Sequence, residues 1–206
     1  MITIVDYNAG NLRSVKRACD AVGIGSELTQ DPEAVIRAER IVFPGVGNAA
    51  SAMRTLEETG LAEAIKTAFY KGIPILGICL GAQIILERSE EGEVFCLGVI
   101  RGVTRRFALK NKTLKIPHMG WNEVRVEIDH PLLNGIQTGD EFYFVHSYFP
   151  DPADPIHIYA TTDYGRRFCS ALGKDNLFAA QFHPEKSGRL GLEILKRFAA
   201  WEGSPC

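Results

Sequence analysis

The sequence predicts an α/β fold: an open, mixed, mainly parallel sheet with helices on both faces. In the first half, short apolar runs alternate with helical patterns, an order typical of parallel strands joined by crossover helices. The second half contains runs rich in aromatic and β-branched residues with short turns between them, which indicates antiparallel hairpins added to that sheet. We expect residues 1–203 to form a single domain and residues 204–206 a C-terminal tail.

The first half alternates regularly between strand and helix patterns. Its predicted strands are buried apolar runs at 1–6, 40–43 and 73–78. Leu12, Val15, Cys19 and Val22 recur at helical spacing and predict the first helix. The further predicted helices are 33–37, 49–58 and 61–71, with another that starts at about Leu80.

The second half reads as strands followed by one helix. The predicted strands are 94–107, 121–128, 142–148, 156–162, 169–172 and 177–182. The final helix carries Leu190, Ile194, Phe198 and Trp201 on one stripe, which predicts a face that packs against the sheet.

Length and charge exclude several classes of protein. A chain of 206 residues is long enough to bury a core. The formal net charge of -2 argues against a nucleic-acid-binding protein, which usually carries a basic excess. No apolar run approaches the ~20 residues that span a bilayer, so we expect no membrane association. The N-terminus lacks the basic and apolar regions of a signal peptide, and we expect a cytoplasmic protein.

The five cysteines predict neither a disulfide framework nor a metal site. Their number is odd, and none of them forms a Cys-x-x-Cys pair. No set of His, Cys, Asp and Glu has the spacing of metal ligands. We therefore expect no metal and no cofactor, and most cysteines should be reduced thiols.

Gly77-Ile78-Cys79-Leu80-Gly81 has the G-x-C-x-G pattern of a nucleophile elbow, with cysteine in place of serine. The pattern lies where a predicted strand turns sharply into a helix, and a Cβ at either glycine would clash in such a turn. The turn would expose the thiol at the carboxyl edge of the sheet, near a helix N-terminus that favours the thiolate. The alternative is a buried cysteine in a glycine-bounded turn, but the spacing favours the nucleophile.

His183 is the best candidate for the base that a cysteine nucleophile needs. It follows the last predicted strand, and Glu185 lies two residues further on, where it could orient the imidazole. Without the cysteine elbow, we would interpret His-Pro-Glu as an ordinary turn. His118 and His146 remain competing bases. The other two histidines, His130 and His157, look structural.

Gly45-Val46-Gly47-Asn48-Ala49-Ala50 formally matches a dinucleotide-binding fingerprint. It lies in a later βα unit, and the strand after it ends in Cys79 rather than in the expected acidic residue. We interpret it instead as a turn beside the elbow. There Val46, together with Leu80 of the elbow, would offer a backbone N–H to an oxyanion.

Taken together, these segments resemble the class I (triad) glutamine amidotransferases, which have a flavodoxin-like fold. Within that family, the chain is most similar to glutaminase subunits of the synthases that form imidazole glycerol phosphate in histidine biosynthesis. The elbow and His-Pro-Glu are shared by the wider class, whereas the segment 115–122 is the specific one. The matching segments are 6–7, 10–12, 44–47, 77–81 with Gln83, 115–122, 146–148 and 181–187.

The resemblance implies a Cys79–His183–Glu185 triad that hydrolyses L-glutamine through a thioester. It implies that the substrate is held by Gly47, Gln83, Glu91, Ser147 and Tyr148. Ammonia should pass to a (β/α)8-barrel cyclase subunit in a heterodimer. The candidates for that interface are Pro117, His118, Trp121, Asn122 and Lys186.

Some residues depart from the family pattern, although none belongs to the triad. Those near the oxyanion turn leave open whether the oxyanion hole is preformed without the partner. Alternatives are a glutaminase for another ammonia-using enzyme such as pyridoxal phosphate synthase, a stand-alone cysteine hydrolase, or a binding subunit without activity. The departures are Asn8, Asn48, Ala49, Ala82 and Gly188.

Overall fold

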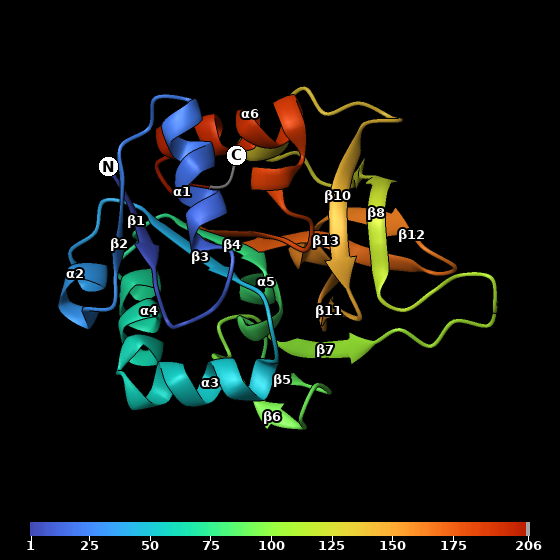
Figure 1. The fold of residues 1–206 in the computed structure, drawn as a ribbon, viewed down its shortest axis with the longest axis horizontal. Helices are drawn as coiled ribbons and strands as arrows, with labels where there is room; N and C mark the ends of the chain where they lie inside the picture. Colours follow the sequence, from blue (N-terminus) through green and yellow to red (C-terminus); the bar gives the residue numbers. More distant parts are fainter. Residues whose placement is uncertain (205–206) are drawn as a thin grey trace.

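An eight-stranded sheet lies at the centre of the computed structural model, which describes residues 1–204 (Figure 1). Its strand order is β2-β1-β3-β4-β14-β13-β12-β9. The first five strands are parallel, and the last three continue the sheet in antiparallel pairing. The predicted mixed, mainly parallel sheet is therefore confirmed. The bounds are β1 Ile2–Val5, β2 Ser26–Thr29, β3 Ile41–Gly45, β4 Ile75–Cys79, β9 Arg125–Val126, β12 Ile158–Asp163, β13 Arg167–Lys174 and β14 Leu177–Ala180.

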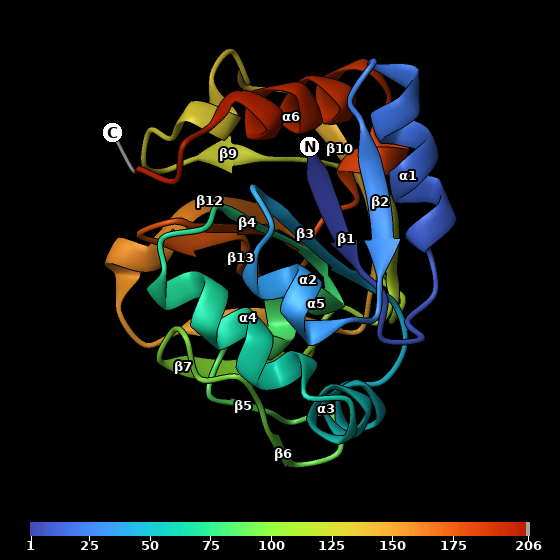
Figure 2. The same ribbon diagram turned by 90° about the vertical axis from the view of Figure 1, so that its left-hand side faces the viewer.

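Helices cover both faces of this sheet (Figure 2). Helices α1 and α6 share one hydrophobic core, to which α6 contributes Ile194, Leu195 and Phe198. The other four helices pack on the opposite face, in a second core with Phe43 and Leu177. The bounds are α1 Leu12–Ala21, α2 Pro32–Ile36, α3 Ala49–Glu58, α4 Leu61–Tyr70, α5 Leu80–Ile84 and α6 Gly188–Ala200.

The predicted elements of the first half agree with the structure except for one missed strand. Strand β2 lies at the sheet edge and has no fully buried residue, so it lacks the apolar run that identifies an inner strand. By contrast, every residue of β3 and β4 is buried. Buried parallel strands read as continuous apolar runs, and these two were predicted for that reason.

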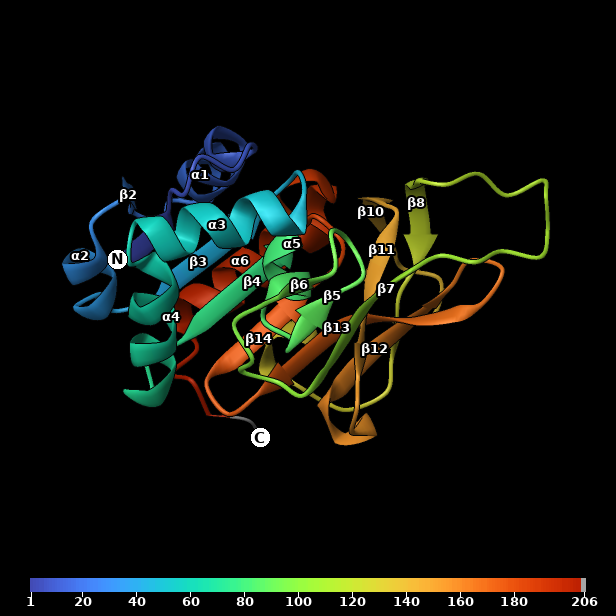
Figure 3. The ribbon, with the colours of Figure 1, turned by 90° about the horizontal axis from the view of Figure 1, so that it is seen from below.

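Two smaller sheets extend from the C-terminal part of the main sheet (Figure 3). One pairs β10 with β8, and the other has the order β11-β7-β5-β6. The bounds are β5 Arg88–Ser89, β6 Val94–Phe95, β7 Gly102–Arg106, β8 His118–Glu123, β10 Glu141–His146 and β11 Tyr148–Pro152. Three short 3₁₀ helices complete the elements of the described residues: η1 Pro131–Leu133, η2 Pro155–His157 and η3 Pro184–Lys186.

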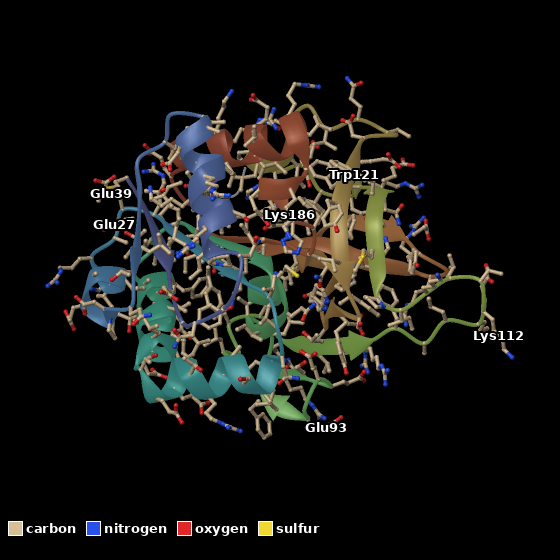
Figure 4. All side chains as sticks on the ribbon, in the orientation of Figure 1. Glu27, Glu39, Glu93, Lys112, Trp121 and Lys186 are labelled. Carbon is tan, nitrogen blue, oxygen red and sulfur yellow. The ribbon has the colours of Figure 1, made fainter. Side chains whose placement is uncertain are left out.

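Two of the predicted long strands are wrong as single elements. The stretch 94–107 is split into β6 and β7, because the chain turns at Gly98 with a positive φ of 69°. The stretch 121–128 is split between β8 and β9, which belong to different sheets. The loop between β7 and β8 projects from the body, with Lys112 at its far end (Figure 4).

No helix in residues 1–204 combines the length and apolar character needed to cross a membrane. Residues 205 and 206 of the predicted tail, with Cys206, lie outside the described residues.

Candidate active site

The elbow at Cys79 is an abrupt turn from β4 into α5. Cys79 has φ 54° and ψ -102°, a conformation that is costly for a residue with a side chain. A Cβ at Gly81 would lie 2.0 Å from the carbonyl oxygen of Phe43, and one at Gly77 would lie 2.9 Å from the Cβ of Ala179. Only glycine therefore fits on either side of the turn, which explains the G-x-C-x-G spacing.

The turn after β3 lies directly beside this elbow. Gly45 is paired with Cys79 in the sheet register, and a Cβ at Gly45 would lie 2.0 Å from the Tyr7 hydroxyl oxygen. The chain then continues into Val46 and Gly47, and α3 begins two residues later. The structure thus brings Val46 and Leu80, the two predicted oxyanion residues, to the wall of one cavity.

The cavity has a volume of about 270 Å³ and contains Cys79, which is 6% exposed. Its walls come from the turn after β3, the elbow, and the segments around Glu91 and Tyr148. All five residues predicted to hold the substrate line it: Gly47, Gln83, Glu91, Ser147 and Tyr148.

Glu91 is the acidic group of the cavity. One carboxylate oxygen accepts a hydrogen bond of 2.7 Å from the Ala49 backbone N–H at the start of α3. Burial raises the pKa of Glu91, and the bond from Ala49 opposes that shift. The carboxylate is thereby held at the cavity wall, where it can face a cationic group.

His183 and Glu185 form a buried pair in the segment that follows β14. The His183 Nδ1 lies 2.7 Å from the Glu185 Oε1, and neither side chain is exposed. Burial lowers the pKa of His183, but the opposing effects of Cys79 and Glu185 are larger and raise it to about 10. Within residues 1–204, its Nε2 has no hydrogen-bond partner. This arrangement leaves Nε2 free to exchange a proton with a reacting group.

The competing bases, His118 and His146, are hydrogen-bonded to each other. His146 Nδ1 donates to the Tyr148 carbonyl oxygen at 2.8 Å, because a carbonyl can only accept. Its Nε2 then accepts from the His118 Nδ1 at 3.0 Å. Burial lowers their pKa values, to about 4 for His118 and about 3 for His146. The His118 Nε2 accepts from the Asn122 amide at 3.2 Å, so both nitrogens of each ring are engaged. Neutral imidazoles in this state make poorer bases than His183.

The prediction that His118 faces a partner is wrong. Its side chain is 2% exposed and stacks on Tyr164 at 3.9 Å and on Phe144 at 4.9 Å. Side chains of a strand alternate between its two faces, and on β8 this alternation turns His118 inward while Met119 and Trp121 point outward.

The other predicted interface residues lie at or near the surface. Trp121 is 53% exposed, and its ring lies 6.1 Å from that of Tyr143. The Lys186 Nζ lies 5.8 Å from the centre of the same Tyr143 ring, and Figure 4 labels both Trp121 and Lys186. Asn122 is half-buried, and Pro117 is exposed and also lines the Cys79 cavity.

The two histidines expected to be structural are tied to the backbone. The His130 Nδ1 accepts from the Leu132 N–H at 3.2 Å, and its ring stacks on Phe178 at 4.7 Å. The His157 Nδ1 donates to the Gly173 carbonyl oxygen at 3.0 Å.

Two further polar side chains contact this site, and sequence reasoning had given neither a role. The Asn11 amide donates to Glu185 and lies 3.4 Å from His183 Nδ1. The Gln181 amide lies 3.6 Å from the sulfur of Cys79. Both residues belong to segments that carry the resemblance, but their contacts join positions more than 100 apart, which no local pattern reveals.

Comparison with known proteins identifies the family of the chain. The family described as "Glutamine amidotransferase class-I" matches residues 3–200. The subunit HisH of imidazole glycerol phosphate synthase from Desulfovibrio desulfuricans is 48% identical, over 96% of this chain and 93% of that protein. The protein of the same name from Aromatoleum aromaticum is also 48% identical, over 97% of this chain and 98% of that protein.

Solved structures share the fold at lower identity. A structure described as a glutamine amidotransferase superposes with a TM-score of 0.75 at 18% identity, over 98% of this chain and 100% of its own. PurLQS from Thermotoga maritima superposes with a TM-score of 0.69 at 21% identity, over 96% of each chain.

Proposed function

The chain belongs to the class-I glutamine amidotransferase family, and on this premise we propose that it is the glutaminase subunit of an imidazole glycerol phosphate synthase. It hydrolyses L-glutamine to glutamate and ammonia, and the ammonia is used by a (β/α)8-barrel cyclase subunit in histidine biosynthesis. One observation carries the proposal: a single cavity joins the elbow cysteine to the five residues expected to hold glutamine.

In the proposed reaction, the Cys79 thiolate attacks the side-chain amide carbon of glutamine. The carbonyl oxygen becomes an oxyanion, which the N–H groups of Leu80 and Val46 stabilise. The His183 imidazolium gives its Nε2 proton to the amide nitrogen, and ammonia leaves as the thioester forms. Water then loses a proton to His183 and attacks the thioester carbon. The carbon–sulfur bond breaks, and glutamate and the Cys79 thiolate are released.

The cavity walls provide recognition as well as chemistry. The Glu91 carboxylate is the group suited to the α-ammonium of glutamine, since a partly buried carboxylate pairs well with a cation that enters beside it. Gly47, Gln83, Ser147 and Tyr148 surround the remaining space and define its length. A substrate with a free α-amino group is therefore favoured over a peptide-linked glutamine.

An exposed apolar face beside this cavity supports docking of the cyclase. Met119 is 62% exposed on the outer face of β8, next to Trp121 and on the same strand end as Pro117. Tyr143 and Lys186 continue this face, and the Tyr143 carbonyl oxygen accepts from the His183 N–H at 2.9 Å. Aromatic residues and methionine are enriched at the centres of protein interfaces. A partner at this face would contact residues adjacent to the proposed base.

The decisive test is glutaminase activity measured with the cyclase partner and its ligand. Cys79→Ala should abolish ammonia release, because no other group in the cavity can form the thioester. Cys96→Ala is the matched control: Cys96 lies outside the cavity, and burial raises its pKa to about 12. Full activity in Cys79→Ala would refute the proposed nucleophile. Wild-type turnover that is equally fast without a partner would refute the subunit role.

The docking face can be tested separately through binding. Trp121→Ala should weaken association with the cyclase by about tenfold or more, because buried tryptophans often dominate interface affinity. Phe95→Ala is the control: Phe95 is equally aromatic and 79% exposed, but it lies on β6 in a different sheet. Titration calorimetry measures both variants. Equal affinity in Trp121→Ala and wild type would place the interface elsewhere.

A further inference from the structure

Gln181 connects the nucleophile to the substrate cavity through a buried chain of amides. The residue follows the last position of β14, and its side chain is fully buried. Its Nε2 lies 3.6 Å from the Cys79 sulfur, and its Oε1 lies 2.9 Å from the Nε2 of Gln83. The same Gln83 nitrogen lies 2.9 Å from the carbonyl oxygen of Tyr148.

The chemistry of these contacts determines which way each amide points. A backbone carbonyl can only accept a hydrogen bond, so the Gln83 atom that faces Tyr148 must be the nitrogen. That nitrogen uses its second hydrogen on Gln181, so the Gln181 atom that faces it must be the oxygen. The NH₂ group of Gln181 must then face Cys79, because the other hydrogen bonds determine the orientation of the amide.

We propose that Gln181 is a catalytic residue that donates an N–H hydrogen bond to the Cys79 sulfur and stabilises it as the thiolate. The thiolate is the reactive form of cysteine, and a donor aimed at the sulfur favours that form over the thiol. The Val145 carbonyl oxygen, 4.0 Å from the sulfur, can only accept and so interacts with the neutral thiol alone. The burial of Gln181 strengthens its bond, because water does not compete for the donor.

The donor acts beside several titratable groups, which remain in place when Gln181 alone is changed. Tyr7 faces the sulfur from the segment after β1, and its pKa is raised by burial and by Cys79. His183 and Glu185 approach from the segment after β14, and His146 lies at the end of β10. Glu91 lines the same cavity. A change in the behaviour of Cys79 on substitution of Gln181 therefore reports the amide itself.

The proposal rests on Cys79 as the nucleophile of the proposed function, but its test requires neither glutamine nor the cyclase. The full-length chain is treated with iodoacetamide over a range of pH, and the rate is read by mass spectrometry on the tryptic peptide 72–88. Cys79 is the only cysteine of that peptide. The rate of alkylation rises with the thiolate fraction, so its pH midpoint reports how strongly the site favours the thiolate.

Two substitutions separate loss of the donor from addition of charge. Gln181→Met keeps similar volume without a donor, and its pH midpoint should rise by about one unit, about the value of a hydrogen bond to a charged group. Alkylation at pH 7 should then be about tenfold slower, with an unchanged plateau at high pH. Gln181→Glu places a carboxylate at the sulfur and should raise the midpoint further. Gln137→Glu, on an exposed loop, is the matched control and should leave the midpoint unchanged.

A third variant keeps the test valid if substitution of Gln181 prevents folding. Gln83→Met leaves Gln181 in place but removes the donor that orients its amide, and it should give a smaller rise in the midpoint. Circular dichroism and thermal unfolding establish that each variant is folded. Folded variants with a wild-type midpoint would overturn the proposal, as would a lowered plateau without a shift, which indicates a structural role only. Failure of the cyclase to stimulate the enzyme would refute the proposed function and leave this result standing.

Discussion

The two halves of the chain, residues 1–86 and 87–204, hold the proposed catalytic side chains in different ways. In the N-terminal half, steric contacts hold Cys79: a Cβ at position 81 would meet the Phe43 carbonyl oxygen and one at position 77 the Ala179 side chain on β14, so only glycine fits at either position. In the C-terminal half, hydrogen bonds hold His183: its Nδ1 donates to Glu185, which also accepts from the Asn11 amide. The first device is visible in the sequence as two glycines at fixed offsets from Cys79, whereas the second depends on residues that only the whole fold brings together.

The largest expected effect comes from disturbing the steric device. In Gly81→Ala, the new Cβ would lie 2.0 Å from the Phe43 carbonyl oxygen, so the elbow must move. A displacement of about 1 Å at a reacting group can cost about a hundredfold in rate. We expect at least that loss in ammonia release with the partner present. Iodoacetamide labelling of Cys79 should slow in parallel.

Gly25→Ala is the matched control for the elbow variant. A Cβ at Gly25 meets no atom of residues 1–204 within 4 Å, so the same chemical change should leave the rate close to that of the wild type. If Gly81→Ala were as active as Gly25→Ala, the elbow would be tolerant of movement and the contrast between the two halves would fail.

The same contrast explains how much the sequence could predict. The elbow, β3 and β4 were predictable, because their signals are glycines at fixed offsets and continuous apolar runs. The division of 94–107 into β6 and β7 was not, because strand pairing in the C-terminal half depends on partners distant in the chain: β7 pairs with β11 and β5, and β6 with β5. Strand β2 was missed because it lies at the edge of the sheet, and an edge strand need not be apolar.

The candidate site divides in the same way. Cys79, His183 and Glu185 became candidates because they lie in short motifs that combine chemistry with turn geometry. The sequence does not reveal that His118 points inward. Alternation along a strand leaves open which of its two faces is buried, and here the face of His118 packs on Tyr164. The contacts of Asn11 and Gln181 were missed for a related reason: each follows from the packing of two distant segments.

A smaller effect is expected from weakening the hydrogen bonds that hold His183, the proposed base. Asn11 donates to Glu185 and has a left-handed backbone, with φ 81°. Asn11→Gly removes the donor but keeps that backbone accessible. We expect kcat for glutamine to fall between about tenfold and a hundredfold, the range for loss of a bond to a charged group, with KM little changed. Steady-state kinetics over a range of pH measure both constants.

Asn8→Gly is the control for this substitution. Asn8 is also left-handed, with φ 62°, and is exposed with no contact to His183 or Glu185 among the described hydrogen bonds. Its kcat should match that of the wild type. A rise in KM with unchanged kcat in Asn11→Gly would indicate that Asn11 acts on substrate binding and does not position Glu185.

The last prediction concerns the free energy of unfolding, on which the expected effect at neutral pH is the smallest. It applies to the C-terminal half, because all five histidines lie in residues 87–204. Burial lowers the pKa of His130 to about 4, so the unfolded state binds a proton that the folded state excludes. Its contribution to stability is present above the ordinary pKa of about 6.5 and is lost as the pH falls toward 4. Between pH 7.5 and pH 5, this one residue should account for about 2 kcal/mol of the decrease in unfolding free energy.

His130→Asn tests this contribution, because Asn can still accept from the Leu132 N–H but does not titrate. Urea unfolding at the two pH values should show a decrease smaller by about 2 kcal/mol than in the wild type. Leu132→Val is the control: it removes a methylene from a fully buried neighbour and should lower stability equally at both pH values. If His130→Asn kept the full pH dependence, the acid sensitivity would have to come from His118 and His146. Since His146 lines the candidate active-site cavity, acidification would then act on the site and the fold together.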